Sequence, residues 1–172
     1  MTGIDHCIWE GVSCNSDGYV TLLVLSSNQL TGPIPVAIGN LVNLELVGLN
    51  DNQLTGPIPE AIGDLVSLKD LHLQGNELTG SIPETIGNML NLEQVGLFSN
   101  QLTGPIPETI GNMVNLNYLY LYGNELTGPI PEAISYLVNL QVLYLTGNQL
   151  DRPTPEWLTT FCEIRTTLEC WI

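Results

Sequence analysis

The stretch that decides the fold runs from Asn52 to Leu73 and reads NQLTGPIPEAIGDLVSLKDLHL. Its frame, L-x-x-L-x-L-x-x-N-x-L-T-G-x-I-P-x-x-I-G-N, recurs along the chain with a constant period of 24 residues. The asparagine of the frame marks successive repeats at Asn28, Asn52, Asn76, Asn100, Asn124 and Asn148. A fixed period of this length is typical of a solenoid, in which each repeat buries its apolar side chains only against its neighbours. We therefore expect an α/β repeat solenoid.

The repeats account for most of the chain. Its 172 residues are interpreted as a single domain, because a repeat array needs no separate globular core. We expect an amino-terminal cap over residues 1–16, six repeats over residues 17–160 and a carboxyl-terminal cap over residues 161–172. The last repeat departs from the frame at Asp151, Arg152 and Thr154. Aromatic side chains that suit a closing cap lie at Trp157, Phe161 and Trp171.

Within each repeat, the L-x-x-L-x-L portion alternates apolar and variable residues with the period of a half-buried strand. In the third repeat, Leu68, Leu71 and Leu73 are expected to face inward. Stacked side by side, these strands predict one parallel sheet that lines the inner, concave face. We expect each repeated asparagine to turn its side-chain amide toward backbone groups that leave the strand.

The composition is strongly acidic, with 18 Asp and Glu residues against three Lys and Arg residues and a net charge of −15. Nucleic-acid binders neutralise phosphates with clustered Lys and Arg, so the sequence excludes that class. An anionic membrane surface would repel the chain, and no apolar run is long enough to cross a bilayer. Membrane insertion is therefore not expected. The charge favours solubility and basic or cationic partners.

The four cysteines form two pairs at opposite ends of the chain, Cys7 with Cys14 and Cys162 with Cys170. Six stacked strands at roughly 4.8 Å spacing separate the ends by about 24 Å, so one metal ion cannot bind all four. Two local disulfides explain the spacing and indicate an extracellular or other oxidising compartment. Free thiols in a reducing compartment are the alternative. The opening residues, MTGIDHC, lack the basic end and apolar centre of a signal peptide.

The run from Cys7 to Cys14, CIWEGVSC, resembles the C-x-W-x-G-V-x-C signature at the amino end of plant-type extracellular leucine-rich repeat proteins. The repeated LTGxIPxxIGNL consensus is typical of the same class, and the resemblance covers nearly the whole chain. It implies a right-handed leucine-rich repeat solenoid. The family usually carries a longer helical segment before the first cysteine, whereas six residues precede Cys7 here. We expect Trp9, lying over a disulfide, to cover the apolar cross-section of the first repeat.

The resemblance extends to polygalacturonase-inhibiting proteins and to receptor-kinase ectodomains, which bind proteins and peptides. Basic residues on the binding faces of the inhibitors are missing from this sequence, so enzyme inhibition is not carried over. The resemblance also implies a second short strand at L-T-G-x-I-P and a short helix or 3₁₀ turn that begins at Pro-Glu. Proline at a first helical position and glutamate in the first turn both suit that start.

Two regular ladders accompany these turns. The glutamates lie at Glu60, Glu84, Glu108, Glu132 and Glu156. We interpret them as caps of the helical turns that face water on the convex side, rather than as a row of cation sites. The threonines lie at Thr31, Thr55, Thr79, Thr103 and Thr127. Their β propensity explains them, and ice binding is the minor alternative.

Information about a ligand is expected where the repeats differ, on the outward side chains of the concave strands. Aromatic residues gather there on adjacent strands, at Phe98, Tyr118, Tyr120, Tyr122 and Tyr144. Neighbouring positions on adjacent strands form one continuous surface. Tyrosines there present rigid apolar faces with hydroxyl tips, which suit a protein or peptide and also a glycan. The alternative is that these residues reflect strand propensity and cover one another.

Polar residues adjoin the aromatic ones at Asp70, His72 and Gln94. His72 is expected to stand in a notch between Gly48 and Gly96. A lone exposed histidine is more often a hydrogen-bonding surface residue than a metal ligand or a pH switch. We include these polar residues in the predicted binding surface and predict no metal site.

The sequence gives no support for catalysis. It contains no H-E-x-x-H motif, no glycine-rich phosphate loop beside a lysine and no evident Ser-His-Asp set. We therefore predict a non-enzymatic module without a cofactor, which binds a protein or peptide on its concave face. The alternative is a structural subunit of a larger assembly that uses its edges and its convex face.

Overall fold

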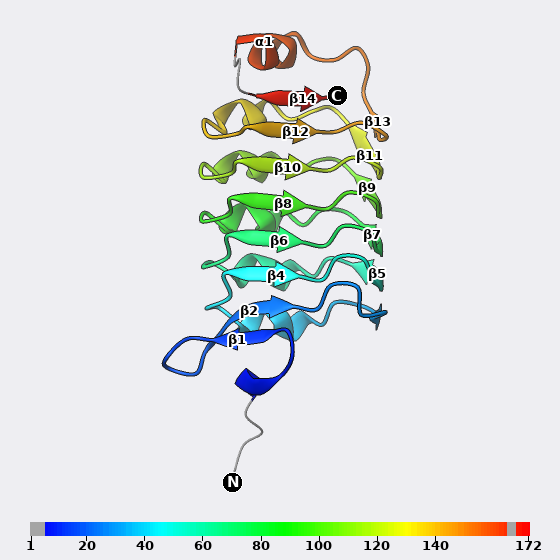
Figure 1. Ribbon diagram of the computed structural model, residues 1–172. Coiled ribbons are helices and arrows are strands. Elements are labelled where there is room, and N and C mark those ends of the chain that lie inside the picture. Colours follow the sequence, from blue (N-terminus) through cyan, green and yellow to red (C-terminus); the bar gives the residue numbers. More distant parts are fainter. Residues whose placement is uncertain (1–5, 165–167) are drawn as a thin grey trace.

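The computed structural model describes residues 6–164 and 168–172, which form the predicted repeat solenoid. Each repeat makes one turn around an apolar core, and the turns stack into a column (Figure 1). Among the described residues, the concave sheet has eight strands in the order β1-β2-β4-β6-β8-β10-β12-β14. Their bounds are β1 (Val12–Cys14), β2 (Val20–Val24), β4 (Leu46–Gly48), β6 (Asp70–His72), β8 (Gln94–Gly96), β10 (Tyr118–Tyr120), β12 (Val142–Tyr144) and β14 (Glu169–Trp171).

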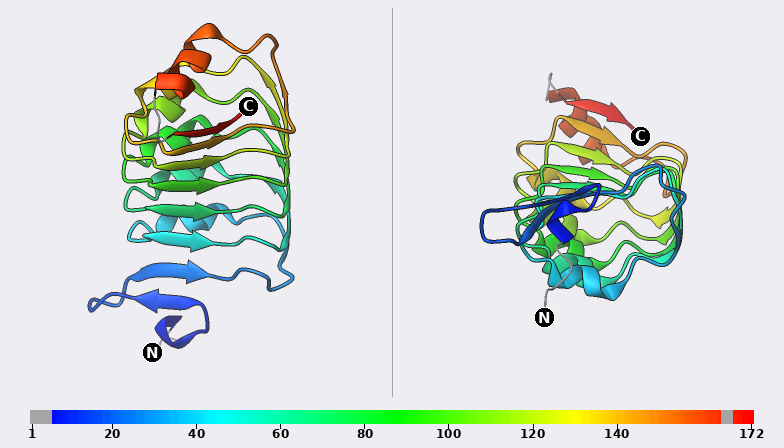
Figure 2. Two further views of the ribbon diagram at one scale, coloured as in Figure 1. Left: turned by 45° about the horizontal axis from the view of Figure 1, so that its top comes forward. Right: turned by 60° about the horizontal axis from the view of Figure 1, so that its bottom comes forward.

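The second short strand that the L-T-G-x-I-P segment implies is present and forms a second ladder along the column. Its strands are β3 (Thr31–Gly32), β5 (Gln53–Pro57), β7 (Glu77–Gly80), β9 (Gln101–Gly104), β11 (Glu125–Gly128) and β13 (Gln149–Leu150). Short 3₁₀ helices close the convex side of the first five turns, as the oblique views of Figure 2 show. They are η2 (Val36–Asn40), η3 (Glu60–Asp64), η4 (Glu84–Asn88), η5 (Glu108–Asn112) and η6 (Glu132–Tyr136).

The expectation that the ladder glutamates cap the helical turns is wrong for the 3₁₀ helices. The N-cap residue of η3 is Pro59, in an extended conformation, and no side chain makes a capping hydrogen bond there. The same holds at Pro83 before η4. Proline has already removed one backbone donor and fixed the entry angle, so the glutamate that follows stays exposed on the convex side.

The core is a continuous stack of aliphatic side chains. Leu71, Val95, Leu119 and Leu143 occupy the same position in successive strands and are fully buried. Burying one such side chain contributes about 1.5–3 kcal/mol, and only adjacent repeats supply the contacts. A single repeat therefore cannot bury its apolar side chains by itself and is stable only when stacked against its neighbours.

The repeated asparagines hold the backbone between turns, as predicted. The Nδ2 amide of Asn100 donates to the carbonyl oxygen of Leu73 at 3.0 Å and to that of Leu97 at 3.1 Å. Its Oδ1 atom accepts from the backbone N–H of Leu78 at 3.0 Å. These groups are buried, so water cannot replace the side chain.

Both predicted disulfides are present. Cys7 is bonded to Cys14 with a Cα–Cα distance of 5.5 Å, and Cys162 is bonded to Cys170 with a Cα–Cα distance of 6.1 Å. The first joins η1 (His6–Ile8) to β1, and the second joins α1 (Glu156–Ile164) to β14. Among the described residues, no helix is long and apolar enough to span a membrane.

The two ends are closed differently. The expectation that Trp9 covers the first repeat is wrong, because Trp9 is 55% exposed and β1 instead pairs antiparallel with β2 along the edge of the concave sheet. The core beneath stays open as an apolar hollow of about 350 Å³, lined by Leu23, Leu30 and Ile38 among others. At the carboxyl end, α1 lies over the last turn with Leu158 fully buried, and β14 extends the concave sheet (Figure 2).

The Asn100→Ala variant is expected to lower the free energy of unfolding by about 3–5 kcal/mol, because it removes the hydrogen bonds to the Leu73 and Leu97 carbonyls and leaves the buried N–H of Leu78 without a partner. Urea denaturation followed by circular dichroism measures this loss. Asn115→Ala is the matched control: the exposed Asn115 donates to the carbonyl oxygen of Leu90 at 2.9 Å, and its loss is expected to cost less than about 1 kcal/mol. Equal losses of unfolding free energy in the two variants would contradict a special stabilising role for the buried asparagine.

Candidate functional site

The register of the concave sheet places equivalent outward side chains side by side. Asp70 pairs with Gln94, and Gln94 pairs with Tyr118. In the next row, His72 lies between Gly48 and Gly96, as predicted. The same row continues through Gly96, Tyr120, Tyr144 and Trp171. Sequence positions that are 24 residues apart thus become neighbours about 4.8 Å apart.

Six aromatic side chains form what we call the aromatic surface, on β10, β12, β14 and the segments after β8 and β10. They are Phe98, Tyr118, Tyr120, Tyr122, Tyr144 and Trp171. The rings of Phe98 and Tyr122 stack with centroids 4.4 Å apart and an interplanar angle of 11°. Tyr120 meets Tyr144 edge to face at 5.4 Å. These contacts hold the rings in defined orientations while most keep part of their faces open to solvent.

A hollow of about 340 Å³ opens in this face. Its lining consists of His72, Gln74, Gln94, Gly96, Phe98, Tyr120, Tyr122 and Tyr144. Gly96 leaves the space, since a Cβ atom there would lie 2.6 Å from Oε1 of Gln74. That Oε1 atom is buried and has no hydrogen-bond partner. The hollow therefore combines aromatic walls with an unsatisfied acceptor.

The structure brings the predicted residues Asp70, His72 and Gln94 next to the aromatic ones, on β6 and β8. Burial lowers the pKa of His72, and the nearby Asp70 carboxylate opposes this effect only in part. The imidazole is therefore neutral at neutral pH and adds no positive charge to the face.

Sequence reasoning missed Glu169 and placed Trp171 only in the cap. β14 pairs with β12 so that Glu169 lies beside Val142, and Trp171 beside Tyr144. The Tyr144 hydroxyl donates to Oε1 of Glu169, and Nε1 of Trp171 donates to the same atom at 3.1 Å. The signal was the alternation of residues 168–172, in which Leu168 is buried while Glu169 and Trp171 point outward.

The hydrogen bonds from Tyr144 and Trp171 hold the pKa of Glu169 below its ordinary value, because they favour the ionised carboxylate. The Tyr144 hydroxyl donates this hydrogen bond, and its own pKa is raised as a result. At neutral pH the outer end of the aromatic surface therefore carries a carboxylate, held by two neutral donors.

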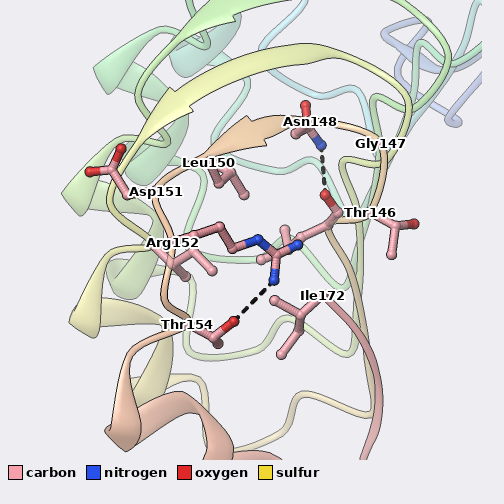
Figure 3. Close-up of a pocket in the computed structure, with 10 residues that line it drawn as sticks. Thr146, Gly147, Asn148, Leu150, Asp151, Arg152, Thr154 and Ile172 are labelled. Atoms are coloured by element: carbon pink, nitrogen blue, oxygen red, sulfur yellow. Dashed lines mark hydrogen bonds between the residues drawn. The ribbon is translucent and has the colours of Figure 1, made fainter.

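The cations in the described part of the chain are Lys69, the residue before Asp70, and Arg152. Nζ of Lys69 is 2.7 Å from Oε2 of Glu45, so this cation is already paired. Arg152 lies past β13 in a separate small cavity, where it donates to Oγ1 of Thr154 at 3.2 Å (Figure 3). That cavity has a volume of about 30 Å³, enough for one water molecule.

Comparison with known proteins agrees with this architecture. The model of the leucine rich repeat family matches residues 19–78 and 90–150. The chain belongs to the leucine-rich repeat family. Two of the curated relatives are plant receptor-like kinases, one from Oryza sativa subsp. japonica with 50% identity over 46 residues and one from Arabidopsis thaliana with 46% identity over 39 residues. The aligned stretch covers 26% and 23% of this chain and 5% of each relative.

Three solved structures share the leucine-rich repeat solenoid. A chain of the BIR3–SERK2 complex from Arabidopsis thaliana is 34% identical, with a TM-score of 0.77 over 89% of this chain and 81% of that one. The Arabidopsis receptor kinase HAESA, in complex with the peptide hormone IDA and the co-receptor SERK1, gives 29% identity and a TM-score of 0.73 over 94% and 36%. A plant ice-binding protein gives 33% identity and a TM-score of 0.81 over 87% and 49%.

The contact of Glu169 with Trp171 is expected to break only in acid. Because the pKa of Glu169 is lowered from 4.5, the contact stabilises β14 at neutral pH and is lost as the pH falls through that lower value. The indole N–H resonance of Trp171, followed by NMR from about pH 7 to about pH 2, is expected to shift with a midpoint below 4.5. Glu169→Gln is expected to abolish this titration. A midpoint above 4.5, or the same shift in the variant, would refute the contact.

Proposed function

We propose that the protein is a non-enzymatic binding module that recognises a protein or peptide on its aromatic surface. The observation that carries this proposal is the hollow of about 340 Å³ over Gly96, walled by rings that contact one another. Tyrosine and tryptophan supply large contact areas at low cost in side-chain entropy, and they are enriched where binding energy concentrates. An exposed aromatic cluster on a folded protein marks a binding site, because a partner that covers it removes apolar surface from water.

The comparisons support the same class of function. Structures similar to this chain include receptor-kinase ectodomains, and HAESA is bound to a peptide hormone and a co-receptor in the structure that contains it. Two disulfides suit an extracellular location for the present chain as well. The proposal carries over the binding of a peptide or protein. The aromatic surface is the reason for placing this binding on the concave face, and the partner is left to be found.

Ice binding is a second candidate, because a plant ice-binding protein shares the fold and the threonine ladder lies on the second sheet with Thr79 and Thr103 exposed. Regular spacing of about 4.8 Å between rungs is its physical basis. Thermal hysteresis that disappears in a Thr79→Lys/Thr103→Lys variant would favour ice binding over peptide recognition.

The aromatic surface is tested by screening the purified protein against peptide and glycan libraries beside a Tyr118→Ala/Tyr120→Ala/Tyr122→Ala variant. We expect the variant to bind the hits of the unchanged protein more than about tenfold more weakly, because each ring contributes roughly 1–2 kcal/mol at the centre of an interface. Circular dichroism and thermal unfolding check that the variant keeps its fold.

The matched control is Tyr19→Ala/Tyr136→Ala, which removes two tyrosines that are 57% and 65% exposed and lie outside the aromatic surface. It is expected to retain every hit. Hits that persist in the triple variant would overturn the proposal. Stoichiometric partners recovered equally well by both variants would instead favour a structural subunit that binds by its edges or convex face.

A further inference from the structure

The charge of the concave face restricts the chemistry of its ligand. In the described part of the chain, the basic side chains are Lys69, which Glu45 already pairs, and Arg152, which lies past the second sheet. Neither lines the hollow, although the Lys69 ammonium is close enough to Asp70 to interact with its carboxylate. A ligand that presents a free carboxylate, a phosphate or a sulfate therefore finds no counter-charge on the aromatic surface.

Carboxylates instead flank the aromatic surface at both ends. In the outward row, Asp70 on β6 follows Leu22 and Leu46, and Glu169 ends the row on β14. Both hydrogen bonds that hold the Glu169 carboxylate fall on Oε1. The second oxygen, Oε2, is therefore left to accept from a ligand, in an orientation that Tyr144 and Trp171 fix in advance.

Between these carboxylates lie ring faces and an acceptor that lacks a donor. Tyrosine and tryptophan rings attract a cation placed over their faces, and a guanidinium also stacks on them. Oε1 of Gln74 is buried at the hollow without a hydrogen-bond partner. A ligand N–H group would donate to this oxygen once the Gln74 side chain rotates toward the ligand. Carboxylates, ring faces and a free acceptor all favour a donor-rich cation.

The geometry sets the spacing between such groups. Four strand steps separate β6 from β14 in the concave sheet. At about 4.8 Å a step they span about 19 Å, which an extended chain of about six residues covers. A peptide that crosses the strands can thus place one cationic side chain near Asp70 and another near Glu169.

We propose that the ligand of the aromatic surface is a basic peptide with two cationic side chains about six residues apart, one near Asp70 and one at Oε2 of Glu169. The inference rests on the proposed function and specifies the chemistry of its partner. The net charge of −15 draws such a peptide toward the protein, while the two carboxylates fix where it lies.

Fluorescence anisotropy with a labelled peptide tests this inference. The probe carries two arginines six residues apart in a Gly/Ser/Ala sequence with blocked ends. Its comparison peptide replaces both arginines with citrulline, which keeps the shape and removes the charge. We expect the arginine peptide to bind at least about tenfold more tightly, and we expect its affinity to fall as salt is added.

The protein variants are Glu169→Gln and Asp70→Asn, with Glu125→Gln as control. Each removes one negative charge, but Glu125 lies exposed on β11, in the second sheet. We expect each concave-face variant to weaken binding of the arginine peptide roughly threefold to tenfold, and the control to stay within about twofold. Thermal unfolding confirms that all three variants are folded.

Three results would overturn the inference: no binding of the arginine peptide, equal binding of the citrulline peptide, or equal weakening by Glu125→Gln. The last would mean that net charge alone attracts the probe. If library hits still depend on Tyr118, Tyr120 and Tyr122 in any of these cases, the proposed function stands and only the basic ligand is wrong. If they do not, the proposed function is wrong as well.

Discussion

From Asn52 to Asn148, each repeated asparagine makes hydrogen bonds to backbone groups of two adjacent repeats, and this sharing fixes how the turns stack. Asn76 is 8% exposed. Its amide donates to the carbonyl oxygen of Leu49 in the preceding repeat and to that of Leu73 in its own, while its Oδ1 atom accepts from the N–H of Leu54. A residue inserted in one repeat would break these buried hydrogen bonds. Hydrogen bonding therefore holds the period of 24 residues alongside the apolar core.

The constant period also determines which outward side chains become neighbours on the concave face. Because each strand repeats the register of the one before, an outward position of the frame becomes a row of neighbouring side chains across the sheet. The buried leucines carry the stability, so outward residues are free to vary with little effect on the fold. The aromatic surface arises in this way, from variable positions that an invariant frame brings together. Its carboxylates lie on either side of the rings, Asp70 on β6 and Glu169 on the last strand, β14.

Much of the fold could be predicted from the sequence because the information is local and repeated. The period indicates the strands, the proline of each of the first five repeats indicates the start of a 3₁₀ helix, and the cysteine spacing indicates both disulfides. The rows of Tyr118, Tyr120 and Tyr144 follow from the same counting. Their role in binding a ligand stays a prediction.

The ends of the column could not be predicted in this way, because there the frame is broken. Trp171 lies beside Tyr144 although 27 residues separate them in place of 24, since α1 replaces a shorter 3₁₀ helix. Counting by the period therefore misses Glu169 as well. At the other end, the motif around Trp9 did not indicate that β1 would pair with the sheet edge and leave the indole in solvent. Strand pairing there involves residues outside the repeat pattern.

A crystal structure of the protein with the tightest ligand from the libraries would test the central claim most directly. We expect the ligand to cross the concave sheet between β6 and β14 and to cover the ring faces of Tyr120 and Tyr144. A ligand bound on the convex helices or on the second sheet, with those rings left in solvent, would contradict a binding module that uses its aromatic surface.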